Sequence, residues 1–506
     1  MNNWRIGGLI AVAILAAWLA IRSCTPQEQK SELPPPPARE VFHASKPLRI
    51  EVTGQPDAQG KAMDVTWLEH ELRYVLGRGQ MRVATIPPKK TDDAFTLKLD
   101  IAADRQRASL ALVAPDAVVE RKQELTLTSE SRLASLSSLV APLPKFLNAV
   151  NASADWTQLI GTTDPKLYET FIGSAMELLG PTGRGFTRPP LQRARFIERL
   201  ETVARSQPGF ARAWGVLAAS YLSVGGEDEA SLAQLAESTA ERALSLDDDL
   251  AVAHAALGLV HLRRNEWIAA REQFDRALTL DSNDAAALEG LGCLLVDAGR
   301  NAAARPIVER AVTLQPRNIG ALECLAYARL GTNEEKSTDD TRDAVAQSPA
   351  AARVEALAAI LSGDTDSARQ LLRDSLSRED FDLWAGSLLQ AATDRRHIPD
   401  ALQAVTRAAS DGAIDPATEI LCGTALRQSE FVFNRMSRLR RQREHVPLRM
   451  FWLPQTAFLR QRRRMEQIVS TAGLPAFWQE HGTPDVCASE PKVYGCKIRP
   501  DAPRNE

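Results

Sequence analysis

Apolar and polar residues alternate in short runs over the first part of the chain. Residues 48–52 and 95–101 alternate as half-buried strands do, whereas residues 63–76 follow the helical period. Further strands are predicted at residues 81–84, 108–113 and 125–127. A closing helix is predicted at residues 134–150, where Pro142 and Pro144 should interrupt it. The pattern predicts a small α/β domain over residues 46–153.

Farther along, apolar residues keep the helical period and the pattern repeats itself. Leu257, Gly258, Ala270 and Phe274 are followed 34 residues later by Leu291, Gly292, Ala304 and Val308. This period, with small residues at these positions, is typical of tetratricopeptide repeats, each a pair of antiparallel helices. Weaker copies extend the array over residues 160–443, and carboxyl-terminal helices with a cysteine-containing tail follow over residues 444–506. The predicted fold class is therefore α+β, a small α/β domain followed by a mostly α-helical tetratricopeptide solenoid.

One helix pair cannot bury its own apolar face, so such repeats stack into a solenoid with a concave groove. In tetratricopeptide arrays, positions 2, 5, 9 and 12 of each first helix face this groove. In the central repeats they are Val252, Ala255, Leu259 and Leu262, then Ala286, Glu289, Cys293 and Val296, then Gly320, Glu323, Tyr327 and Leu330. We predict a protein-binding groove at Leu259, Leu262, Glu289, Glu323 and Tyr327. An apolar groove edged by two glutamates suits a helix or extended segment with apolar anchors and a basic residue.

The amino terminus differs in composition from the rest. Residues 6–21 form an apolar run between Arg5 and Arg22, which predicts a signal anchor or transmembrane segment within residues 1–24. Two alternatives stay open: a lipoprotein anchored at Cys24, and ordinary signal cleavage. Residues 25–45 contain four consecutive prolines and predict a semi-rigid linker. Each alternative places the bulk of the chain across a bacterial inner membrane, in the periplasm, and the first makes the protein single-pass.

Charge and motifs exclude several classes of function. The 61 basic and 64 acidic residues give a net charge of −3, which makes no case for binding nucleic acid. His70 and Glu71 match half of a zinc-protease motif, but Tyr74 stands where the second histidine would be needed. We predict no catalytic residues, no metal and no cofactor, and hence no enzyme.

Cysteines and arginines supply two further candidate sites. Cys487 and Cys496 predict a disulfide in an oxidising compartment, with free thiols or a metal as the alternatives. Cys293, Cys324 and Cys422 lie in predicted helices and are interpreted as small packed residues. A basic cluster interleaved with Phe451, Trp452 and Phe458 is a possible anion-binding site, through Arg440, Arg441, Arg443, Arg462, Arg463 and Arg464. The alternative is a solvated helix face whose aromatic residues are core.

Several motifs carry a family resemblance. Residues 163–168 lead from the small domain into helices, residues 208–214 open a repeat, and the tail contains Phe477, Trp478, Cys487 and a Tyr494-Gly495-Cys496 ending. Together they resemble the export-side region of CadC-type membrane-bound winged-helix regulators, in which a unit similar to the amino-terminal domain of TolB precedes tetratricopeptide repeats. Those regulators carry a cytoplasmic DNA-binding domain, and only residues 1–5 precede the apolar run here.

The expected function is that of a membrane-anchored periplasmic scaffold, which binds another cell-envelope protein through its repeat surface. The alternative is a sensory module that binds a small molecule at the α/β domain or the interdomain cleft and signals through a membrane partner. The partner's identity and the oligomeric state are not predicted.

Overall fold

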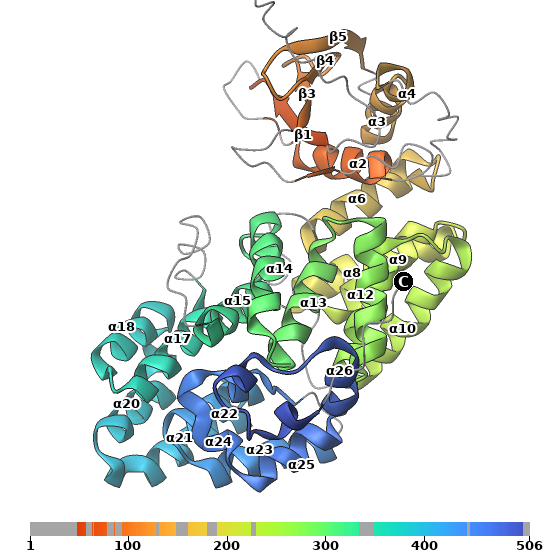
Figure 1. Ribbon diagram of the computed structural model, residues 1–506. Helices are drawn as coiled ribbons and strands as arrows, with labels where there is room; N and C mark the ends of the chain where they lie inside the picture. Colours follow the sequence, from red (N-terminus) through yellow and green to blue (C-terminus); the bar gives the residue numbers. More distant parts are fainter. Residues whose placement is uncertain are drawn as a thin grey trace, which may run out of the picture. The chain divides into compact units, whose positions relative to one another are not determined.

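The computed structural model describes residues 48–56, 63, 65–77, 85–86, 94–127, 131–147, 160–179, 190–223, 229–332, 348–442 and 446–498. These residues form a small sheet domain followed by a succession of helix pairs, which confirms the predicted fold class (Figure 1). No helix in this part of the chain is long and apolar enough to cross a membrane. The predicted anchor at residues 6–21, Cys24 and the proline-rich linker lie outside the described residues.

In the described part of the chain, the sheet has five strands in the order β2-β1-β3-β4-β5. They are β1 (Leu48–Gly54), β2 (Thr85–Ile86), β3 (Phe95–Ile101), β4 (Arg107–Val113) and β5 (Val119–Thr126). β1 is parallel to β2 and β3, whereas β3, β4 and β5 are antiparallel neighbours. The strand predicted at residues 125–127 begins earlier, at Val119. Its first residues are mostly charged and partly or fully exposed along the sheet edge, so no apolar alternation marks them.

Among the described residues, three helices accompany the sheet: α2 (Thr66–Gly77), α3 (Arg132–Val140) and α4 (Leu143–Phe146). The single helix predicted at residues 134–150 is divided between α3 and α4 at Ala141 and Pro142. Proline lacks the amide hydrogen that a continuing helix needs, and the break falls at the first of the two prolines. The predicted strand at residues 81–84 lies outside the described residues.

The helical region is a series of antiparallel pairs. Its helices are α6 (Pro165–Leu179), α8 (Pro190–Ser206), α9 (Ala211–Leu222), α10 (Glu229–Leu246), α11 (Ala251–Arg263), α12 (Trp267–Leu280), α13 (Ala285–Asp297), α14 (Asn301–Leu314), α15 (Ile319–Thr332), α17 (Pro349–Ser362), α18 (Thr365–Ser375), α20 (Gly386–Thr393), α21 (Ile398–Ser410), α22 (Pro416–Ala425) and α23 (Ser429–Arg441). Short helical turns at residues 378–385 and 395–397 connect the later pairs.

The repeat sequence explains where these helices begin and how they pack. Asp284 caps α13 by accepting from the Ala287 amide over 2.8 Å, and Asn318, 34 residues later, caps α15 in the same way. The ring of Phe274 lies against Gly258 and Gly290. A Cβ atom added to either glycine would lie 2.5 or 2.3 Å from that ring, so only glycine fits.

After α23 the chain returns to earlier repeats. Short helices follow in the order η3 (Arg449–Trp452), η4 (Pro454–Thr456), α24 (Ala457–Arg460), α25 (Arg463–Thr471), α26 (Leu474–His481), η5 (Asp485–Ala488) and η6 (Tyr494–Lys497). In Figure 1 these blue segments lie against green helices of the central repeats. Helix α26 contacts α12, and η3 contacts α13 and α15. The central repeats and the carboxyl-terminal helices share one continuous core.

Candidate functional site

The predicted groove positions fall into a covered set and a less buried set. Leu262, Cys293 and Tyr327 are at most 9% exposed, whereas Leu259 and Glu289 are half-buried. Over Tyr327 lies a segment of the chain itself, residues 446–453, which we call the strap. The carboxyl-terminal half of the groove is thus occupied by the protein's own chain.

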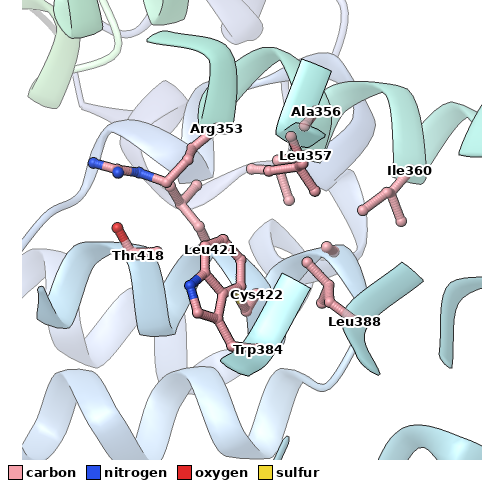
Figure 2. A pocket seen from close by; sticks show the side chains of 11 residues that line it. Arg353, Ala356, Leu357, Ile360, Trp384, Leu388, Thr418, Leu421 and Cys422 are labelled. Carbon is pink, nitrogen blue, oxygen red and sulfur yellow. The ribbon is translucent and has the colours of Figure 1, made fainter. Parts of the chain in front are cut away.

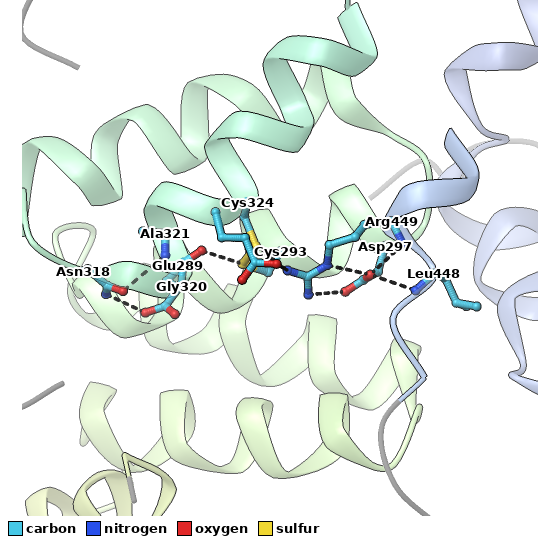
Figure 3. The surroundings of a disulfide bond; sticks show 10 residues. Glu289, Cys293, Asp297, Asn318, Gly320, Ala321, Cys324, Leu448 and Arg449 are labelled. Atoms are coloured by element: carbon cyan, nitrogen blue, oxygen red, sulfur yellow. Dashed lines mark hydrogen bonds and ion pairs between the residues drawn. A yellow bond between two sulfur atoms is a disulfide. The ribbon is translucent and has the colours of Figure 1, made fainter. Parts of the chain in front are cut away.

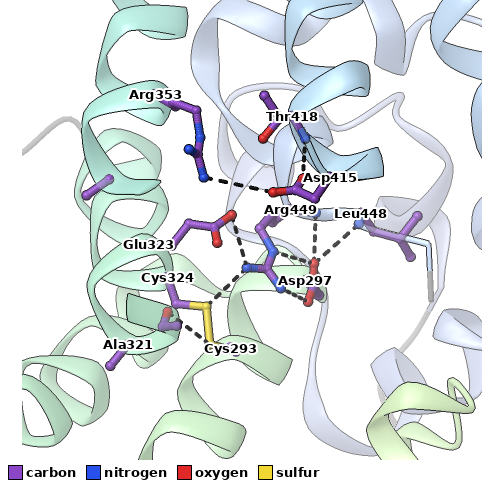
Figure 4. Close-up of polar contacts among 12 residues, drawn as sticks. Cys293, Asp297, Ala321, Glu323, Cys324, Arg353, Asp415, Thr418, Leu448 and Arg449 are labelled. Carbon is purple, nitrogen blue, oxygen red and sulfur yellow. Dashed lines mark hydrogen bonds and ion pairs between the residues drawn. A yellow bond between two sulfur atoms is a disulfide. The ribbon is translucent and has the colours of Figure 1, made fainter. Parts of the chain in front are cut away.

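Arg449 joins the strap to α13 and α15 (Figure 4). Its Nε and Nη2 donate to Oδ1 and Oδ2 of Asp297 over 3.1 and 2.9 Å, and its Nη1 lies 3.7 Å from Oε1 of Glu323. Nη1 also lies 3.3 Å from Sγ of Cys324, and the guanidinium carbon lies 5.7 Å from the ring centre of Tyr327. Burial alone would lower the pKa of Arg449, but the Asp297 and Glu323 carboxylates outweigh it and raise that pKa.

Asp297 is the buried counterpart of this arginine. It is 0% exposed, and its Oδ1 also accepts from the backbone amides of Leu448 and Arg449 over 3.3 and 3.0 Å. A buried carboxylate is tolerated only when it is paired and hydrogen-bonded, and the strap supplies both conditions. Neither Asp297 nor the role of Arg449 was predicted from the sequence.

Apolar residues of the strap are buried as deeply as any in the protein. Met450, Phe451, Trp452 and Leu453 are all 0% exposed. The Trp452 indole donates to the Asp297 carbonyl over 2.7 Å and meets Trp478 edge to face, with ring centres 5.6 Å apart. Since each such side chain contributes about 1.5–3 kcal/mol on burial, the apolar residues of the strap stabilise its place in the core.

A disulfide between Cys293 and Cys324 lies beside Arg449 (Figure 3). It joins α13 to α15, the first helices of consecutive repeats. The sequence interpretation of these cysteines as separate packed residues is wrong. The one available signal was that Cys293 occupies a groove-facing position; Cys324 follows such a position, and its direction toward Cys293 depends on how the two repeats stack.

The other half of the groove opens into a cleft of about 380 Å³. One wall is α2, with His70, Arg73 and Tyr74. The rest comes from α6, α9, the carboxyl-terminal ends of α12 and α14, and the amino-terminal ends of α11, α13 and α15 with the turns before them. These residues include Val252, Asp281, Asp284, Ala286, Glu289, Thr313 and Asn318. Apolar surface predominates, with carboxylates among it, and the volume suits a short chain segment or a small ligand.

A buried ion pair fixes the α2 wall to the repeats. Glu71 of α2 and Arg212 of α9 form a two-point ion pair, and the Tyr168 hydroxyl of α6 donates to Glu71 Oε2 over 2.9 Å. The Arg212 guanidinium also lies 3.8 Å from the ring centre of Tyr74. Burial favours the neutral acid, but the Arg212 charge dominates and holds the pKa of Glu71 far below its usual range. Both groups therefore stay ionised and keep the cleft wall in place.

Two carboxylates in the cleft have raised pKa values. Burial, reinforced by the nearby Asp281 carboxylate, raises the pKa of Asp284 to about 6, although its helix-capping hydrogen bonds oppose this. Burial likewise raises the pKa of Glu289, against a hydrogen bond from Asn318 Nδ2 at 2.6 Å and the charge of Arg449. A cationic ligand would stabilise the charged form of each acid.

The predicted anion-binding arginines have mixed surroundings. Arg440, Arg441, Arg462 and Arg463 are exposed, Arg443 lies outside the described residues, and Arg464 pairs with Glu430 over 2.6 Å. Of the interleaved aromatic residues, Phe451 and Trp452 are fully buried and Phe458 is half-buried. These aromatic side chains thus belong mainly to the core, and anion binding by the exposed arginines stays a prediction.

The tail is closed by a disulfide and is linked to the strap through Arg460. Cys487 and Cys496 form a disulfide. Arg460 is buried, pairs with Glu490 and donates to the carbonyls of Phe451 and Leu453. Arg460 therefore links Glu490 of the tail to the backbone of the strap.

A smaller cavity lies among α17, α20 and α22 (Figure 2). It measures about 20 Å³ and is lined by Trp384, Leu388, Leu357 and the free thiol of Cys422. This space holds about one water molecule and no ligand. Within the described ranges, no three histidine, cysteine or acidic side chains are grouped so as to hold a metal ion.

No family model and no curated protein matches the chain. Among solved structures it is similar to PilF of Pseudomonas aeruginosa, at 20% identity over 46% of this chain and 91% of that chain, with a TM-score of 0.29. It is also similar to MamA, at 21% identity over 34% of this chain and 93% of that chain, with a TM-score of 0.23. Both are tetratricopeptide-repeat proteins.

The deciding observation is in the chain itself: helix pairs recur with a 34-residue offset between the caps Asp284 and Asn318, and between Gly258, which lies against Phe274, and Gly292, which lies against Val308. The fold of the helical region is that of a tetratricopeptide-repeat protein. In this tetratricopeptide array, half of the groove is filled by the strap and half opens into the cleft.

Proposed function

We propose that this protein is a tetratricopeptide scaffold that binds a protein partner in the cleft beside α2. The observation that carries the proposal is the division of the groove. The strap already occupies the α13–α15 half with buried contacts, whereas the adjoining half opens into a space of about 380 Å³. Tetratricopeptide arrays act as interaction surfaces, and the cleft is the part of this groove that a partner could enter without displacing the core.

The finer features of the proposal come from the sequence. The apolar run at residues 6–21 supports a single-pass anchor, with a lipid anchor at Cys24 as the alternative. Two disulfides support an oxidising compartment, since disulfides are rare in the cytosol. The partner would then be another cell-envelope protein, in keeping with the resemblance to the export-side region of CadC-type regulators.

A second candidate function is a small-molecule sensor that uses the same cleft. The observation that favours it is that α2 of the sheet domain forms one wall, so a ligand would touch both the sheet domain and the repeats. Clefts between domains are common sites for small ligands. Saturable thermal stabilisation by a metabolite would support this function.

Photocrosslinking in intact cells separates the two functions. Thr313 is exposed and lines the cleft, and a photoreactive benzophenone residue there should capture one protein. Thr279 is its match one repeat earlier: it is exposed, bonds the carbonyl four residues back like Thr313, and does not line the cleft. The scaffold requires an adduct at position 313 that is absent at position 279. Identical adducts at both positions, or none at position 313, would reject it.

A further inference from the structure

The contacts of the strap indicate which kind of segment the neighbouring cleft would bind. We propose, building on the scaffold function above, that the cleft selects a partner segment with an arginine or lysine between apolar residues, and that Glu289 receives the cation. The scaffold function requires only that some protein binds in the cleft, whereas this proposal names the chemistry of the bound segment.

The repeat places two glutamates at equivalent positions. Glu289 of α13 and Glu323 of α15 stand at the same repeat position, 34 residues apart. Glu323 faces Arg449 of the strap, with Nη1 at 3.7 Å from its Oε1. Glu289 accepts from Asn318, and no arginine or lysine among the described residues forms an ion pair with it. The cleft therefore repeats the glutamate of the site that holds Arg449, although not its Asp297, and no arginine or lysine of the described chain is paired with this glutamate.

The two positions belong to one continuous surface. Figure 3 shows Glu289 and Asn318 on one side of the Cys293–Cys324 disulfide and Arg449 on the other. The Arg449 charge lowers the pKa of Glu289, which opposes the larger effect of burial, so the filled and the open positions are within electrostatic reach. A segment bound in the cleft would therefore lie next to the strap along the same groove.

The remaining charges of the cleft favour a cation as well. Its two arginines are already paired, Arg73 with Glu69 at 2.8 Å and Arg212 with Glu71. Among the described side chains, Asp281, Asp284 and Glu289 form no ion pair within 4 Å, although Asp281 interacts at longer range with Arg310 and Glu289 with Arg449. A segment ending in a carboxylate would meet these three acids, whereas a basic side chain would neutralise them.

Apolar flanks are required by the rest of the lining. Val216, Ala219, Val252 and Ala286 border the cleft with small apolar surfaces. The strap shows the corresponding pattern in its sequence, where Arg449 lies between Leu448 and Met450. A highly basic, polar segment would leave these surfaces uncovered and would gain little from burial.

The test uses the hexapeptide Leu-Arg-Met-Phe-Trp-Leu, capped at both ends, and the full-length protein in detergent. Fluorescence polarisation should show saturable binding that weakens at least tenfold with Glu289→Gln, because glutamine keeps the bond from Asn318 and removes only the charge. The peptide with glutamine for arginine should lose the same affinity. Glu309→Gln, on α14 and already paired with Arg305, should change nothing.

Three results would overturn the proposal: no binding, equal binding of both peptides, or loss of binding with Glu323→Gln but not with Glu289→Gln. The last result would mean that the peptide displaces the strap. None of these results affects the photocrosslink at position 313. If a partner were captured there but the peptide did not bind as expected, the scaffold function would stand and only the preference for a cation would be rejected.

Discussion

The two halves of the groove have similar helices and different contents. Around α13 and α15, Glu323 and Tyr327 are covered by Arg449, and the adjacent strap residues are completely buried. Around the starts of α11 and α13, the corresponding surface faces a cleft walled by α2. The repeat pattern predicts the same groove in both places. Which part can bind a partner is decided by segments outside the repeat.

The filled half shows which side chains occupy this groove. Its occupant presents one arginine to two carboxylates and surrounds it with apolar side chains. The open half keeps an acid at the equivalent position, Glu289. The comparison therefore predicts large losses of stability from changes in the filled half and small losses from changes in the cleft.

The largest expected effect is from Trp452→Ala. Loss of a fully buried tryptophan leaves a cavity and should lower the free energy of unfolding by about 3–5 kcal/mol. Urea unfolding followed by circular dichroism measures it. The control, Val252→Ala in the cleft, should cost less than about 1 kcal/mol, because this valine is only half-buried. Equal costs would remove the distinction between the two halves.

The next effect in size is from Arg449→Met. This change leaves Asp297 buried without its cation and should cost about 3 kcal/mol, near the lower end for broken buried pairs because Arg449 is slightly exposed. Arg449→Lys keeps the charge but loses the two-point contact, so its cost should be intermediate. A methionine variant as stable as the wild type would show that the strap is held by its apolar residues alone.

The two disulfides should differ by about 1 kcal/mol. Cys293–Cys324 closes 31 residues and Cys487–Cys496 closes nine, and the longer loop restricts the unfolded chain more. Alanine pairs at each position, compared in urea unfolding without reductant, measure the difference. A larger cost for the shorter loop would show that packing around the tail outweighs loop entropy.

The smallest effect concerns Asp284, whose pKa rises to about 6 on folding. The native protein then binds more protons than the unfolded chain between about pH 4 and 6, so this group's contribution to stability falls as pH rises through that window. Asp284→Asn keeps the side-chain cap of α13 and removes the free-energy cost of ionising a buried carboxyl group. It should be more stable than the wild type by about 1 kcal/mol at pH 7 and equal to it at pH 4, since partial exposure reduces the full effect. A gain of the same size at both pH values would exclude titration as its cause.

Much of the fold could be predicted from the sequence because its signals are local. Alternation located β3, and the 34-residue spacing located α11 to α14 through the equivalent pairs Gly258 with Phe274 and Gly292 with Val308. The groove positions also followed from the repeat. None of these steps needs knowledge of which distant residues meet.

The strap in the groove could not be predicted, because its contacts join residues that are far apart in the sequence. Asp297 and Arg449 are 152 residues apart, and no repeat or motif relates them. The sequence shows Arg449 as one arginine in a basic cluster, and Phe451 and Trp452 as its aromatic neighbours, although all three face inward. The Cys293–Cys324 disulfide was missed in the same way, since its two positions are adjacent only when consecutive repeats stack.

Hydrogen exchange of the strap tests most directly whether the chain permanently fills half of its own groove. The amides of Leu448 and Arg449 donate to the buried Asp297 carboxylate, and that of Phe451 donates to the Leu448 carbonyl. In the full-length protein, a peptide covering residues 446–453 should therefore exchange as slowly as α13 and α15, although it contains little regular helix. Exchange of this peptide within seconds, while α13 stays protected, would show that the strap leaves the groove readily and would contradict the account.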